Sequence, residues 1–124
     1  MISYPVYKLI HLFGIFLLLG SLSGLALYTA NGGSKSTNRF RMWAGIMHGV
    51  GLFLILLAGF GMLARLQITS FPWPAWVFAK TFMWPVFGGL YALVSRKPTV
   101  AKVMWLVIPF LATLTAYIAI FKPF

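Results

Sequence analysis

Four long runs of apolar residues, separated by short polar segments, make up most of the chain. The runs extend over about residues 4–28, 42–66, 75–94 and 103–121. Each has the length of a helix that crosses a hydrocarbon core of about 30 Å. None shows the strict alternation of a membrane β-barrel strand. The pattern predicts an all-α integral membrane protein: one domain, residues 1–124, folded as a four-transmembrane-helix bundle.

The composition agrees with a membrane location. Hydrophobic residues make up 61% of the chain and the mean hydropathy is +0.94, whereas soluble domains are about 45–50% apolar. The chain has ten Lys and Arg residues. In a soluble protein this excess would indicate nucleic-acid binding, but here most cations lie between the apolar runs, as in membrane proteins. We therefore expect a lipid bilayer, and no nucleic acid, as partner.

The chain has no Asp, Glu or Cys, and this restricts its chemistry. No proton transfer can use a protein carboxylate, and no metal can be held by thiolates. An anion that meets membrane-embedded cations must therefore come from a ligand, a lipid or another chain. Porphyrin propionates are one such source.

The basic residues of the connecting segments predict the orientation. The first and third segments hold three cations each, and the second, residues 67–74, holds none. The six cations are Lys35, Arg39 and Arg41, then Arg96, Lys97 and Lys102. The positive-inside rule places the first and third segments in the cytoplasm and both termini outside. The expected location is the bacterial inner membrane.

Small residues and prolines predict how the helices pack. Gly20 and Gly24 form one small-xxx-small pair, and Gly45 and Gly49 form another. Such pairs suit close helix approach, and they would also suit a homodimer. The glycines predict that the second helix packs centrally. The prolines are expected to kink the third helix and to interrupt the fourth. They are Pro85 and Pro109.

Ionisable residues inside the apolar runs are the candidate functional residues, because such residues are costly in a bilayer. Tyr4, Lys8 and His11 share one face of the first helix. His48 lies in the second helix. The third helix carries an aromatic stripe around Lys80, which consists of Trp76, Lys80, Trp84, Phe87 and Tyr91.

Depth in the membrane decides which of these residues can meet. From the helical rise, His11 lies ~10 Å and Lys80 ~8 Å below the outer boundary, and His48 lies ~20 Å below it. A haem held between two helices needs both ligands at one level. The estimate therefore favours His11 with Lys80 over His11 with His48.

These residues have functional and structural interpretations. Neutral imidazole is a good iron ligand, and a neutral Lys80 amine would carry a lone pair for coordination or proton transfer. Lys8 and Arg65 could hold propionates, and Trp84 could line a porphyrin. Alternatively, each His could be an interhelical hydrogen-bonding residue, and each Lys could extend to the membrane surface.

Three stretches of the chain resemble a known family. They are YKLIHLFG (7–14), RFRMWAGIMH (39–48) followed by LLAGFGML, and WVFAKTF (76–82). They resemble the first three helices of the four-helix HemJ-type protoporphyrinogen oxidases and their CopD-like relatives. The resemblance implies that His11 is a haem b ligand and that Lys80 is essential for function. The Leu-Pro-Arg that follows the oxidases' first helix is absent here, and so is a His near GGLY (88–91).

The sequence thus predicts a haem b-binding membrane protein that transfers electrons or oxidises a hydrophobic substrate, with porphyrinogen or quinol as leading candidates. His11 would be the axial ligand, and Lys80 the second ligand or catalytic base. His48 is a further candidate metal ligand. The main alternative is a non-catalytic subunit or assembly factor of a larger respiratory or transport complex. A small transporter is less favoured, because the chain lacks a carboxylate relay.

Overall fold

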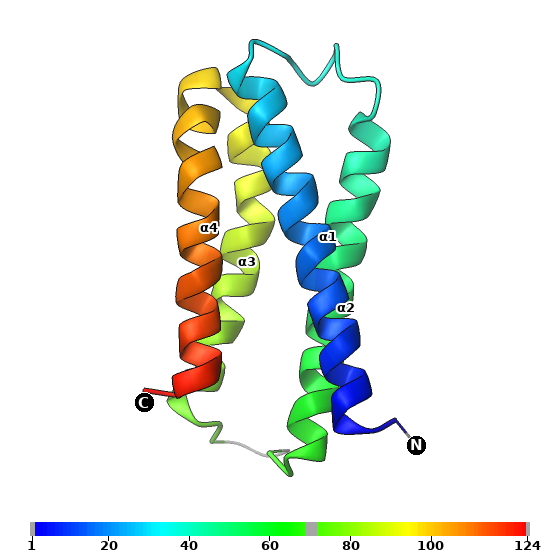
Figure 1. Cartoon of the computed structure of the whole chain (residues 1–124), viewed down its shortest axis with the longest axis vertical. Coiled ribbons are helices and arrows are strands. Elements are labelled where there is room, and N and C mark those ends of the chain that lie inside the picture. The colour runs from blue at the N-terminus through cyan, green and yellow to red at the C-terminus, as the bar shows by residue number, and fades with distance from the viewer. Residues whose placement is uncertain (1, 69–71, 124) are drawn as a thin grey trace.

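The protein folds as four long antiparallel α-helices (Figure 1). The computed structural model describes residues 2–68 and 72–123. The helices are α1 (Tyr4–Ala30), α2 (Arg41–Arg65), α3 (Ala75–Arg96) and α4 (Pro98–Phe121). All four are long and apolar enough to cross a membrane, so the predicted all-α, four-span class is confirmed. The two chain ends lie at the same end of the bundle.

The connection between α3 and α4 is shorter than predicted. The prediction of a loop over residues 95–102 is wrong, because α3 continues to Arg96 and only Lys97 separates it from α4. Lys97 is extended, with φ −132° and ψ 124°, since a residue before proline is disfavoured in the helical region. Pro98 then opens α4, because the first turn of a helix needs no N–H donor. The fourth helix therefore starts at residue 98, not 103.

The internal prolines do not end their helices. α4 runs through Pro109 without a break, so the predicted interruption is wrong. Pro85 likewise lies inside α3. Transmembrane helices tolerate proline because neighbouring groups can satisfy the freed backbone atoms.

α1 and α2 cross at Gly14 and Gly51. A β-carbon on Gly14 would lie 2.9 Å from the carbonyl oxygen of Gly51, and one on Gly51 would lie 2.8 Å from that of Gly14. These neighbours are backbone atoms, which cannot turn aside as a side chain can. Only glycine therefore fits at both positions.

The predicted small-xxx-small pairs do not make this crossing. Gly24 and Gly49 have nothing within 4 Å of a β-carbon position, and Gly20 meets only the Met47 methyl group. Gly45 meets only the Tyr91 hydroxyl, at 3.5 Å. The spacing of small residues does not specify which face of a helix meets a neighbour, and here the crossing uses a different face.

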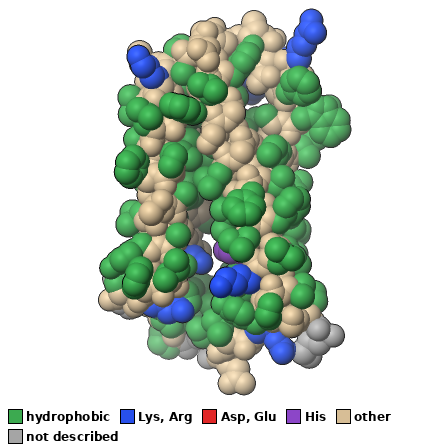
Figure 2. All heavy atoms as spheres, viewed as in Figure 1, with side chains coloured by type: hydrophobic (Ala, Val, Ile, Leu, Met, Phe, Trp, Pro, Cys, Tyr) green, Lys and Arg blue, Asp and Glu red, His purple; other side chains and the backbone are tan. Residues whose placement is uncertain are grey.

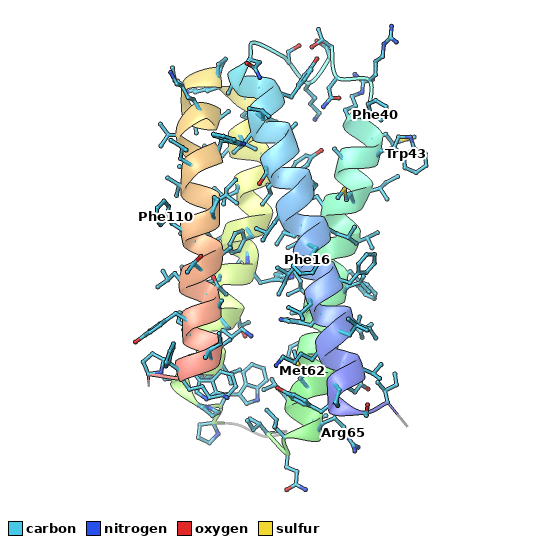
Figure 3. The ribbon with its side chains drawn as sticks, viewed as in Figure 1. Phe16, Phe40, Trp43, Met62, Arg65 and Phe110 are labelled. Carbon is cyan, nitrogen blue, oxygen red and sulfur yellow. The ribbon has the colours of Figure 1, made fainter. Side chains whose placement is uncertain are left out.

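α2 is not the central helix that the glycines predicted, because it contacts only α1 and α3, whereas α1 and α3 each contact all three other helices. The core lies between α1, α3 and α4, where Leu22, Val94 and Ile108 are fully buried. The outside is covered by apolar side chains (Figure 2). Phe110 of α4, for example, points away from the bundle and is 76% exposed (Figure 3). This surface suits lipid contact.

Replacing Gly14 or Gly51 by Ala is expected to lower the free energy of unfolding by about 1–3 kcal/mol, the usual cost of overpacking. The new methyl group would press backbone against backbone and push α1 and α2 apart. Gly49→Ala is the control, because its methyl group meets nothing within 4 Å. Circular dichroism during an SDS titration measures the effect. Equal stability of the three variants would contradict the crossing.

Candidate functional site

His11 lies on the face of α1 that meets α2, one turn before the Gly14–Gly51 crossing, and is only 9% exposed. Gly59 of α2 lies beside its ring, where a β-carbon would be in ordinary contact, 3.5 Å from His11 Cε1. One turn earlier, Tyr7 packs against Gly61, where a side chain would overlap its ring. Two rings of α1 therefore rest on glycines of α2.

The hydrogen bond of His11 determines its tautomer. Nδ1 lies 2.9 Å from the carbonyl oxygen of Ile55 on α2. A carbonyl oxygen only accepts, so Nδ1 carries the proton and donates it. In the neutral ring the lone pair is then on Nε2, to which no group of the described chain donates a hydrogen bond. Metal-ligating histidines are oriented in this way, with one ring N–H bound to a backbone carbonyl or carboxylate.

Lys80 reaches the level of His11 from α3. Its side chain is half-buried, and it lies near enough for its charge to act on the His11 imidazole. Figure 2 shows a histidine in a hollow of the surface, next to Lys or Arg side chains. Lys80 thus lies within electrostatic range of His11, the residue with which the depth estimate pairs it. Their roles as ligand and base stay predictions.

His48 occupies a different level. It precedes Ile55 by seven residues on α2, or about 10 Å along the helix axis. Its Nε2 donates to the carbonyl oxygen of Phe87 at 3.3 Å, and its ring centroid lies 4.6 Å from that of Tyr91. The structure therefore does not bring His48 to His11. Instead, His48 forms a hydrogen bond between α2 and α3, as the alternative to a ligand role predicted.

Trp84 completes a reciprocal pair of hydrogen bonds between α2 and α3. Its indole Nε1 donates to the carbonyl oxygen of Leu52 at 2.9 Å. Leu52 lies one turn after His48 on α2, and Trp84 lies one turn before Phe87 on α3. Each helix thus donates one side-chain hydrogen bond to the backbone of the other. The N–H of Trp84 is engaged there, and its predicted contact with a cofactor is untested.

Lys8 and Arg65 are both exposed. Lys8 lies three residues before His11 on α1, and Arg65 ends α2 at the same end of the bundle (Figure 3). This placement suits contact with an anion at the membrane boundary. Their assignment to propionates stays a prediction.

Lys122 is a residue that the sequence analysis missed. It follows α4 in the left-handed conformation, with φ 46°. Its Nζ lies 5.1 Å from the centroid of the Trp76 ring, and its charge acts on Lys80, one turn along α3 from Trp76. The sequence did contain a signal for Lys122. It directly follows the fourth apolar run, and the end of that run lies at the same side of the membrane as the start of the third run, which carries Lys80. Lys122 therefore adds a cation beside Trp76, at the end of α3 that carries Lys80.

No three His, Cys, Asp or Glu side chains come together as a metal site within residues 2–68 and 72–123. A centre built from several such ligands is therefore not formed in this part of the chain. A haem needs only one or two axial ligands from the protein, and His11 Nε2 meets that smaller requirement.

A scan against models of known protein families, a search of curated proteins and a search of solved structures gave no match. The resemblance of the three stretches is thus not supported by a family match. The chain is a multi-pass membrane protein by the length and hydropathy of its four helices.

Trp84→Phe is expected to lower the free energy of unfolding by about 0.6 kcal/mol, and at most about 1.7, because it removes one interhelical hydrogen bond and keeps an aromatic ring. Trp105→Phe is the matched control, since Trp105 is 43% exposed on α4. An SDS titration of both variants measures the effect. If Trp105→Phe destabilises the protein as much as Trp84→Phe, the hydrogen bond to Leu52 does not hold α2 and α3 together.

Proposed function

We propose that the protein binds haem b through His11 and acts in electron transfer or in the oxidation of a hydrophobic substrate. The observation that carries the proposal is the hydrogen bond from His11 Nδ1 to the Ile55 carbonyl oxygen, which leaves the Nε2 lone pair available. A histidine held in this way is pre-oriented for iron.

The cations of the same end fit the acidic groups of a porphyrin. Lys8 and Arg65 are exposed toward the end of the bundle at which His11 lies. Propionates would pair with such residues through charge-assisted hydrogen bonds. When bound, the haem supplies one-electron redox chemistry, with a potential set by its axial ligands and by burial.

Lys80 supplies the only candidate acid–base group close to His11 on α3. Its amine is half-buried, and it can act as second axial ligand or can take a proton from a substrate that enters from the lipid. A porphyrinogen or a quinol is such a substrate. The resemblance to HemJ-type oxidases and CopD-like proteins supports this role, and it favours the bacterial inner membrane as location.

The optical spectrum of the detergent-purified protein, expressed with ample haem supply, tests the proposal. We expect a Soret band that shifts on reduction with dithionite, and its loss in His11→Ala. Added imidazole should restore the band in His11→Ala, because a free ligand can replace the missing ring. Lys80→Met should keep the band but change its position if Lys80 is the second ligand.

His48→Ala is the matched control, since it removes the other histidine at a different level of α2. It should keep the Soret band. Loss of the band in His48→Ala but not in His11→Ala would show that His48, and not His11, holds the haem, and would contradict the proposal. A featureless visible spectrum of the wild-type protein would overturn the proposal and favour a non-catalytic subunit or assembly factor.

The orientation can be tested with single cysteines, because the chain has none of its own. We propose that both termini lie outside and that the α1–α2 loop is cytoplasmic, as its basic residues indicate. A membrane-impermeant maleimide should label Ser3→Cys in intact spheroplasts. It should label Ser36→Cys only after the membrane is permeabilised. The opposite labelling would invert the topology.

A further inference from the structure

The α1–α2 loop is folded against the end of the bundle by its own hydrogen bonds. The Tyr28 hydroxyl lies 2.6 Å from Thr37 Oγ1, which also accepts from the backbone N–H of Ser34 at 3.0 Å. Gly33 lies directly under the Tyr28 ring, where a side chain would overlap it. Lys35 lies within the turn that these contacts form.

Below this loop, α1 and α2 diverge from their crossing at Gly14 and Gly51 (Figure 1). A hollow of about 250 Å³ opens there toward α3. Its lining combines two cationic residues with polar and apolar ones: Lys35 and Arg41, then Asn38, Tyr91 and Ser95, and Leu25 and Met42. The chain has no Asp or Glu side chain that could neutralise the two cations.

A second hollow of about 330 Å³ lies between the same two helices. It is lined by Gly20 and Gly24 of α1 and by Trp43 of α2, which projects outward and is 61% exposed (Figure 3). Gly24 has open space where a side chain would be. The two hollows share Leu25 and Asn38 as lining residues. A cationic recess thus adjoins an apolar groove.

We propose that this divergence between α1 and α2 binds an anionic phospholipid, with its phosphate at Lys35 and Arg41 and an acyl chain along Gly20 and Gly24. Basic recesses between transmembrane helices bind anionic headgroups on the cytoplasmic side. The adjoining apolar groove favours a lipid over free phosphate. A second copy of the chain is disfavoured, because it would bring equal positive charges together.

Native mass spectrometry of the delipidated protein, titrated with phosphatidylglycerol or phosphatidylcholine, tests the cationic recess. We expect preferential retention of phosphatidylglycerol. Lys35→Gln/Arg41→Gln should weaken it about 25-fold, at about fivefold per cation. The control Arg96→Gln/Lys97→Gln removes two cations of the same end that do not line the hollows. An equal loss in the control would overturn the site in favour of general surface charge.

Gly24→Leu tests the groove, since its side chain would occupy the space proposed for the acyl chain. It should weaken phosphatidylglycerol binding, whereas Gly49→Leu, equally open but outside both hollows, should not. Inorganic phosphate should not compete at equal concentration, and effective competition would identify a free-phosphate site. Conversion of a wild-type dimer to monomer by Gly24→Leu would assign the groove to a second copy. Either result would overturn the proposal.

Discussion

The contact between Gly14 and Gly51 determines the arrangement of both ends of the molecule. Because the two backbones touch there, α1 and α2 are close together over the turns that follow toward the chain termini, where His11 rests on Gly59. The same crossing makes the helices diverge in the other direction, where the hollows below the α1–α2 loop open. The crossing therefore leaves His11 packed between α1 and α2 on one side and an open groove between the same helices on the other.

The missing carboxylates explain which groups hold the helices together. A polar side chain in a bilayer needs an internal partner, and here backbone carbonyls take that place. Ile55 accepts from His11, Leu52 from Trp84 and Phe87 from His48. Among the described residues, no buried side-chain nitrogen or oxygen lacks a partner. Carbonyls of a helix cannot change protonation, so these bonds fix ring orientation without adding charge to the interior.

The sequence was sufficient for the number of helices, their approximate bounds and the separation of His11 from His48 along the bundle, because these depend on apolar length and on a constant helical rise. It did not indicate which face of α1 meets α2. In a bilayer both the lipid face and the packed face are apolar, so periodicity carries little information about rotation. The Ile55 carbonyl and the Gly14–Gly51 contact depend on that rotation and were missed.

Positive charge has different consequences at the two ends. The cations of the α1–α2 loop are exposed and can be screened by water and headgroups. Lys80 is half-buried within a membrane-spanning helix, and the charge of Lys122 acts on it. A charge at such a position is costly unless it is paired, and the chain has no Asp or Glu side chain to pair with it. If Lys80 served only in packing, the free-energy cost of its charge within the membrane would not be compensated. An anionic or iron-bearing ligand between α1 and α3 would offset that cost.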